Sequence, residues 1–184
     1  MKIVVDAMGG DYAPKSIVDG VVEAVKEIDV DITLVGVEEQ VKKELERHQY
    51  PQDRIDVVHA PAVVEMHEPA VVSLRKKRDS SIAVGINLLK EKGYDAFISA
   101  GNTGAVVAVA TINLGMLDGV ERPAIGLVIP TLKGFSFLID VGANTEPKPQ
   151  HLYQSALMAK VYMREVLGVA NPTVGLLNIG EEAG

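Results

Sequence analysis

Small polar residues and glycines separate two apolar runs of the sequence in a pattern that suits anion binding. The segment Ser99–Gly104 reads Ser-Ala-Gly-Asn-Thr-Gly and lies between the apolar runs Ala96–Ser99 and Ala105–Leu117. This order predicts a strand, a glycine turn and a helix. The first turn of such a helix offers unpaired backbone N–H groups and the positive end of its dipole, while glycines let an anion approach closely. Asn102 and Thr103 would add side-chain donors; the alternative is an ordinary strand-to-helix connection that Thr103 caps.

Four predicted strands end in loops of this character. The residues concerned are Asp6, Gly9, Gly10 and Asp11 after the first strand, Ser99, Gly101, Asn102, Thr103 and Gly104 after the strand just described, Asp140, Gly142 and Asn144 after a later strand, and Asn178 and Gly180 after the last. In an open α/β sheet, ligands bind at the carboxyl ends of the strands, so these loops predict one composite anion site. Neither GxxxxGK[ST] nor GxGxxG follows any of the strands, and a dinucleotide is therefore not indicated.

Two aspartates and four histidines could take part in other chemistry. For Asp6 and Asp140 we favour hydrogen bonds accepted from the neighbouring loops, with proton transfer or metal binding as the alternative. The histidines, at positions 48, 59, 67 and 151, show no metal-ligand spacing, and a surface or loop position is expected for each. No metal site and no cofactor are predicted. The sequence has no cysteine, which excludes disulfides, thiolate ligands and a cysteine nucleophile.

Four basic residues form one short run: Arg75, Lys76, Lys77 and Arg78. Such a run is ordinarily a solvated face, and the functional alternative is a docking patch for an acidic partner or a phosphate group. Lys148, which lies between two prolines near Asn144, is a further candidate anion contact. The formal net charge is −7 and the other basic residues are dispersed, so a nucleic-acid surface is not expected.

Apolar periodicity predicts the elements that position these residues. Strands are expected at 2–6, 32–36, 54–59, 96–99, 124–129, 135–139 and 174–179, and helices at 17–28, 38–47, 80–92, 105–117 and 151–167. Strands 124–129 and 135–139 are expected to pair antiparallel across a loop at 130–134. The prediction is one α/β domain over residues 1–184, with three αβα layers and a mostly parallel, Rossmann-like sheet. Because the last predicted strand has no helix after it, we expect the domain to be truncated at its C-terminal end.

Composition places the chain among soluble proteins. Hydrophobic residues make up 47% and charged residues 23% of the 184 residues, which is ordinary for a globular domain. The N-terminus has no signal-peptide profile, and the most apolar segment, 105–117, is shorter than the roughly 18 residues typical of a membrane span. A cytoplasmic location is the expectation.

Several motifs together resemble one family. The segments VDAMGGDYAPK, RKKRDSSI, ISAGNTGA, ERPAIG, DVGANTEPKPQHL and VGLLNIGEEAG occur in this order. They resemble the bacterial phosphate acyltransferases of phospholipid synthesis, which transfer a fatty acyl group from acyl carrier protein to inorganic phosphate. The layout after DVGAN is also similar to that of the phosphotransacetylases, and the resemblance implies a fold related to theirs and to that of isocitrate dehydrogenase.

The resemblance implies a site. Phosphate would attack a thioester carbonyl directly, and Asn102, Asn144 and Asn178 would act in catalysis. Asp6, Gly9, Gly10, Asp11, Ser99, Gly101, Thr103, Gly104, Asp140, Gly142 and Lys148 would line the phosphate and substrate site, and Arg75, Lys76, Lys77 and Arg78 would dock the carrier protein. An acyl-enzyme at Ser99 is not favoured, because no histidine is placed in sequence as its partner.

The resemblance also implies partners. A homodimer is expected, and peripheral membrane association is expected through a C-terminal part that this chain lacks, because family members are longer. The alternatives are a phosphotransacylase that uses coenzyme A thioesters, and a non-catalytic module that binds acyl carrier protein or a metabolite.

Overall fold

The chain forms two compact units. The computed structural model describes residues 1–70, 76–91 and 93–178. The units are Met1–Gly115 and Met116–Gly184, and each is described by itself. That the whole chain is a single domain stays a prediction.

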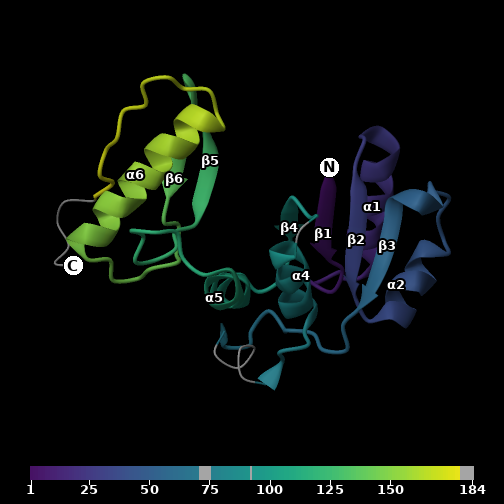
Figure 1. Cartoon of the computed structure of the whole chain (residues 1–184). Coiled ribbons are helices and arrows are strands. Elements are labelled where there is room, and N and C mark those ends of the chain that lie inside the picture. Colours follow the sequence, from purple (N-terminus) through teal and green to yellow (C-terminus); the bar gives the residue numbers. More distant parts are fainter. Residues whose placement is uncertain (71–75, 92, 179–184) are drawn as a thin grey trace. The chain divides into compact units, whose positions relative to one another are not determined.

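The first unit is built on a parallel sheet of four strands (Figure 1). The strands are β1 (Lys2–Asp6), β2 (Asp31–Gly36), β3 (Ile55–His59) and β4 (Ala96–Ile98). Their order is β3-β2-β1-β4 and every neighbouring pair is parallel. The chain builds outward from β1 to β3 and then returns to place β4 on the other side of β1. The topological switch, where ligands bind in open α/β sheets, is therefore between β1 and β4.

Helices cover both faces of this sheet. They are α1 (Lys15–Glu27), α2 (Glu38–Leu45) and α4 (Ser81–Lys90). The unit also contains the helix α5 (Thr103–Leu114) and a short 3₁₀ helix at Gln52–Arg54. The apolar stripes of α1 and α2 pack on one face with Val5 and Leu34, while α4 packs on the other with Val4 and Val35. Neighbouring strand residues point to opposite faces, which is why Val4 and Val5 belong to different cores. The predicted α/β class, with its three layers, is confirmed.

The helix α5 packs on α4 rather than on the sheet. Ala105 and Val109 of α5 form a third apolar cluster with Ile82 and Ile86 of α4. This helix is the most apolar segment of the sequence, and it ends at Leu114, before the Leu117 predicted. In the part of the chain that is described, no helix has both the length and the apolar character needed to cross a bilayer.

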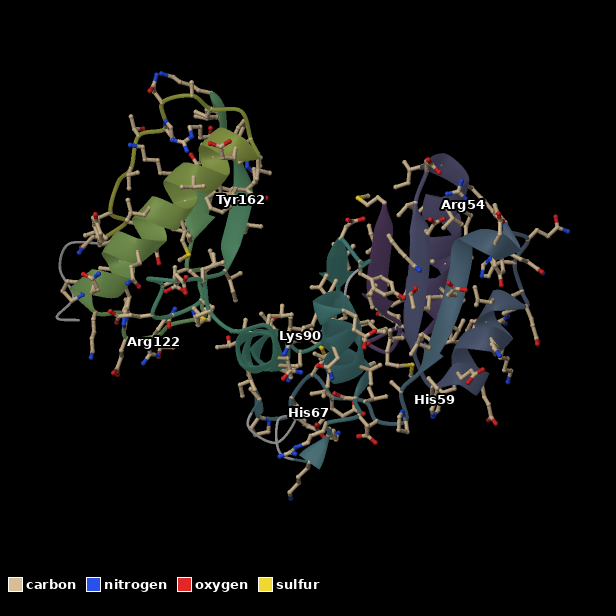
Figure 2. The ribbon with its side chains drawn as sticks, viewed as in Figure 1. Arg54, His59, His67, Lys90, Arg122 and Tyr162 are labelled. Carbon is tan, nitrogen blue, oxygen red and sulfur yellow. The ribbon has the colours of Figure 1, made fainter. Side chains whose placement is uncertain are left out.

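The second unit is a β-hairpin packed against a helix. β5 (Gly126–Thr131) and β6 (Gly134–Ile139) pair antiparallel, as expected, and α6 spans Pro149–Glu165. Tyr162 lies on α6 (Figure 2) and stacks on Phe137 of β6, with ring centroids 4.6 Å apart.

The loop of this hairpin is shorter than the predicted 130–134. Only Leu132 and Lys133 lie between the strands, and Pro130 is paired with Phe135 inside the ladder. A two-stranded ribbon tolerates proline because one side of each strand lies outside the ladder. Gly134 has a φ of 128° at the turn, a conformation that glycine adopts readily.

The predicted last strand, 174–179, is wrong for its described part. Residues 174–178 have no regular secondary structure, and Val174, Leu176 and Leu177 are exposed. An apolar run becomes a strand only when a neighbouring strand accepts its backbone hydrogen bonds, and none of the described strands pairs with this segment. Residues 179 and 180 lie outside the described residues.

A pair of helical glycines tests the packing of α4 on the sheet. A Cβ at Gly85 would overlap the Phe97 ring of β4, whereas one at Gly20 of α1 has nothing within 4 Å. Gly85→Ala is therefore expected to lower the free energy of unfolding by about 1–3 kcal/mol through overpacking. Gly20→Ala is expected to raise it by about 0.5–1 kcal/mol through helix propensity. Urea unfolding of both variants measures this, and equal effects would contradict the packing described.

Candidate functional site

A buried carboxylate joins the ends of β1 and β4. Asp6 is only 1% exposed. Its Oδ1 accepts a hydrogen bond from the Met8 backbone N–H at 3.0 Å, and its Oδ2 accepts one from the Ser99 hydroxyl at 2.7 Å. Ser99 Oγ in turn accepts from the Gly101 N–H at 3.0 Å. Asp6 thus orders the loops that follow both strands, which is the structural role that the sequence favours for it.

The two loops approach each other so closely that glycine is required. A Cβ at Gly9 would lie 2.6 Å from the Gly101 nitrogen and 2.7 Å from Asp6 Oδ2. These are distances that real Cβ atoms do not adopt. Gly10 has a φ of 100°, a left-handed conformation that L side chains rarely adopt. Of the glycines predicted at this site, Gly9 is therefore required by the contact between the loops.

The first turn of α5 starts at this contact. The backbone N–H groups of Thr103 and Gly104 have no hydrogen-bond acceptor among the described residues, because they precede the first intrahelical bond, from Val106 to Asn102. Such N–H groups, together with the positive end of the helix dipole, attract anions. Both oxygens of Asp6 are occupied by donors, which reduces its repulsion of an anion.

The side chain of Asn102 is committed to other contacts. Its Oδ1 caps α5 by accepting from the Ala105 N–H at 3.0 Å. Its Nδ2 lies 2.9–3.0 Å from the backbone carbonyl oxygens of Glu65, Met66 and Glu68. Asn102 is 8% exposed, and in this structure it holds a loop against the helix start. Its predicted direct contact with substrate stays a prediction.

The residues of the basic run differ in their surroundings. Lys77 donates from Nζ to the Val63 carbonyl oxygen at 2.6 Å and to both carboxylate oxygens of Glu68 at 2.6 and 2.7 Å. Lys76 and Arg78 are exposed, and Arg75 lies outside the described residues. The sequence did not distinguish Lys77 from its neighbours, because its partners are 9 and 14 residues away.

In the second unit, Asp140 and Asn144 form a separate group. Asp140 Oδ1 accepts a hydrogen bond from the Asn144 backbone N–H at 3.2 Å, and Asp140 Oδ2 accepts one from Asn144 Nδ2 at 3.1 Å. Asn144 Nδ2 also donates to the Pro123 carbonyl oxygen at 2.9 Å. Asp140 has a φ of 66° and Gly142 a φ of 122°, so the chain turns sharply after β6. That this group joins Asp6 and Ser99 in one composite site stays a prediction.

Three further predicted residues belong to the second unit: Lys148 and His151 at the start of α6, and Asn178 after it. Lys148 is exposed at the start of the helix, and its N–H donates to His151 Nδ1 at 3.1 Å. Asn178 is exposed and has an interaction partner. The expected surface position of His151 is wrong, since it is 6% exposed and its Nε2 lies 3.3 Å from Glu121 Oε2.

Sequence reasoning also missed Gln154. It is 8% exposed, accepts from the Glu121 N–H at 3.0 Å and donates to the Gly119 carbonyl oxygen at 2.8 Å. Its partners Gly119 and Glu121 are more than thirty positions away in the chain, so no local sequence pattern indicates this buried polar face.

A hollow at the end of β3 offers little for catalysis. It has a volume of about 560 Å³ and is lined by Val37, Glu38, Glu39, Lys42 and His59. His59 Nδ1 accepts from the Glu38 N–H at 3.3 Å, and Lys42 pairs with the Glu38 carboxylate at 2.6 Å. None of the predicted site residues lines it. Figure 2 shows His59 and His67 on separate segments, and the described residues include no cluster of acidic and histidine side chains able to hold a metal ion.

Comparison with known proteins shows the family. The family model described as "Fatty acid synthesis protein" matches residues 1–184. The phosphate acyltransferase of Dictyoglomus turgidum is 51% identical over 185 residues, covering 100% of this chain and 55% of the relative. That of Halothermothrix orenii is 48% identical, covering 99% of this chain and 55% of the relative. The chain therefore spans about half the length of the curated relatives it matches.

A solved structure shares the fold. The phosphotransacetylase EutD from Staphylococcus aureus matches with a TM-score of 0.60 over 89% of this chain and 52% of its own. The sequence identity is 21%, so this likeness shows the fold alone.

Removal of the Ser99 hydroxyl tests the junction of β1 and β4. Ser99→Ala takes the donor from Asp6 Oδ2 and the acceptor from the Gly101 N–H. We expect a loss of about 1–3 kcal/mol in the free energy of unfolding, the cost of unpaired buried polar groups. Urea unfolding measures it, with Ser16→Ala on an exposed position of α1 as the control. A loss no larger than that of the control would exclude a stabilising role for the Ser99 hydroxyl.

The Glu68–Lys77 pair predicts a dependence on pH. The hydrogen bond from Lys77 lowers the pKa of the Glu68 carboxyl from its ordinary value of 4.5. A carboxyl whose pKa is lower in the folded state stabilises the protein above its unfolded-state pKa, and the gain is lost as the pH falls through the folded-state pKa. The Tm difference between the wild type and Glu68→Gln should thus be full at pH 7 and shrink below pH 4.5. In a Lys77→Gln background, the Tm difference that Glu68→Gln causes should no longer change with pH. If it still shrinks below pH 4.5, Lys77 is not the cause of the pH dependence.

Proposed function

The chain belongs to the fatty acid synthesis protein family, and we propose that it carries the phosphate-binding part of a phosphate acyltransferase. In the proposed reaction an oxygen of inorganic phosphate attacks the thioester carbonyl carbon of an acyl-[acyl carrier protein]. The C–S bond breaks, giving acyl phosphate and the free carrier thiol. The family match and the curated relatives named phosphate acyltransferase support this proposal.

One observation carries the proposal. The start of α5 presents the N–H groups of Thr103 and Gly104 at the topological switch of the sheet, next to loops held by Asp6 and Ser99. Fixed N–H donors cost no reorganisation when negative charge develops. The same donors can hold phosphate, or the oxyanion that forms at the thioester carbonyl, in a defined geometry. Gly9, Gly10 and Asp11 form the opposing loop of this proposed site.

The proposed chemistry requires no protein nucleophile. Phosphate itself supplies the attacking oxygen. The leaving group is a thiolate, and thiols such as free cysteine have a pKa of about 8.5, so its departure demands little acid catalysis. Ser99 Oγ already donates to Asp6 and accepts from Gly101. These contacts favour a structural role for the Ser99 hydroxyl over an acyl-enzyme.

Further residues are proposed for the substrates. Asn102, Asn144 and Asn178 are proposed catalytic groups, and Asp140, Gly142 and Lys148 are proposed to contribute to the substrate site. Lys76 and Arg78 are exposed and offer positive charge to an acidic carrier protein. From the family resemblance alone, we also propose a cytoplasmic homodimer whose family-length form associates peripherally with the membrane.

Proline at Thr103 tests the proposed phosphate site. Proline is favoured at the first helical position, and the extended backbone of Asn102, with φ −62° and ψ 107°, suits the residue before it. Thr103→Pro therefore deletes one N–H donor while it keeps the helix. We expect kcat/KM for phosphate to fall about 10²-fold, the effect typical of losing one oxyanion donor. Thr103→Ala keeps the N–H and removes only the hydroxyl, so it separates the loss of the backbone donor from the loss of the side chain.

The assay is phosphate-dependent release of free carrier from palmitoyl-[acyl carrier protein]. It compares the chain alone with a family-length chimera in which the chain replaces the matching part of the Dictyoglomus turgidum relative. An inert, well-folded chimera would overturn the acyltransferase proposal, and carrier binding without acyl phosphate would favour a binding module. Faster turnover of palmitoyl coenzyme A would favour a phosphotransacylase. If the Thr103→Pro variant is as active as the wild type, phosphate does not bind to the Thr103 N–H.

A further inference from the structure

The segment from Ala62 to Glu68 is fastened at its start to the first turn of α4. Ala62 forms an isolated parallel bridge with Ser80, and its carbonyl oxygen accepts from the Ser81 N–H at 3.1 Å. Ser80 is fully buried and caps α4 by accepting from the Ala83 N–H. The start of the segment is therefore as fixed as the helix itself.

Lys77 joins the start of the segment to its end. Its ammonium reaches Val63 O, which lies next to the fixed start, and the carboxylate of Glu68 at the far end. The Lys77 carbonyl oxygen accepts from the Ser80 N–H at 3.1 Å, so Lys77 is itself held at the start of α4. One side chain thus closes the segment into a loop whose two ends cannot move apart freely.

The closed loop presents three carbonyl groups to Asn102. The Glu68 N–H donates to Glu65 O at 3.1 Å, which makes residues 65–68 a turn. The carbonyl oxygens of Glu65, Met66 and Glu68 converge on Asn102 Nδ2. The amide of Asn102 has only two hydrogens, so its orientation depends on where the turn is placed. That orientation also aims its Oδ1 at the Ala105 N–H.

We propose that Lys77 and Glu68 are positioning residues for the phosphate site: they hold the turn that orients Asn102, and Asn102 orders the first turn of α5. This inference rests on the proposed function, because it assigns phosphate to the start of α5. It separates Lys77 from the exposed Lys76 and Arg78, which are proposed to meet the carrier.

The partial exposure of the Lys77–Glu68 pair favours a positioning role over a contribution to the overall stability of the protein. The side chains of Lys77 and Glu68 are 25% and 22% exposed, and partly solvated ion pairs contribute little to the free energy of unfolding. The pair nevertheless decides whether three carbonyl groups stay in place beside Asn102. Its loss should therefore disturb local order at α5 more than it disturbs the fold.

Four variants of the family-length chimera test the proposal: Lys77→Gln, Glu68→Gln, the double variant and the conservative Lys77→Arg. The first three should raise KM for phosphate about tenfold, as expected for losing a charge-assisted hydrogen bond, with kcat changed less than about threefold. The double variant should be no worse than either single one, because both remove the same interaction. Lys77→Arg, which keeps the charge and can pair with the carboxylate, should recover most of the affinity.

Lys42→Gln is the matched control, since it breaks an ion pair of equal length with Glu38 on the surface of α2. It should leave KM for phosphate unchanged. An unchanged KM in Lys77→Gln, or a KM raised equally by Lys42→Gln, would overturn the proposal while leaving the acyltransferase function intact.

Amide hydrogen exchange in the 184-residue chain gives a readout that does not need activity. The Ala105 N–H, which Asn102 protects, should exchange about tenfold faster in Lys77→Gln and Glu68→Gln, and at the wild-type rate in Lys42→Gln. If the chimera is inert but this exchange changes as expected, the proposed function fails and the link from Lys77 to α5 stands. Unchanged exchange at Ala105 would overturn that link.

Discussion

The structure of the first unit depends on the burial of one carboxylate. Asp6 ends the central strand β1 and is almost inaccessible to solvent. A buried charge is costly unless donors compensate it. Met8 and Ser99 supply those donors, and in doing so they bring the loops after β1 and β4 together. The contact between the loops in turn excludes a side chain at Gly9 and leaves little room for one at Gly101. A single electrostatic requirement thereby shapes the edge of the sheet at which the helix α5 begins.

The start of α5 is held from two directions. Ser99 accepts from Gly101 on the side of the sheet, while Asn102 is held by the carbonyl groups of the 65–68 turn on the other. This leaves the N–H groups of Thr103 and Gly104 as donors in a rigid setting. The side chains of Ser99 and Asn102 are engaged in internal hydrogen bonds in this structure, and their contact with substrate stays a prediction. At the start of α5, these two backbone donors have no acceptor among the described residues.

Most elements could be predicted because each has a local cause. The apolar runs of β1 and β2, the stripe of α1 and the Ser80 cap of α4 are all properties of neighbouring residues. The strand expected at 174–179 has the same local signature, but its described residues lack a neighbouring strand. His151 was misjudged for a similar reason, since Glu121, the carboxylate next to its buried ring, is thirty positions away in the chain.

The candidate site likewise has features that the local sequence predicts and features that depend on contacts between distant residues. The sequence alone determined which residue types end the strands: the glycines, Asp6, Ser99 and Asn102 could be identified because polar residues after apolar runs are a local pattern. It also determined the family, through motifs distributed over the whole chain. Only the tertiary structure decided which of these side chains are free to meet a ligand. Lys77 is paired with Glu68 while Lys76 is exposed. Hydrogen bonds and ion pairs join residues that are distant in sequence, and their partners become known only when the chain is folded.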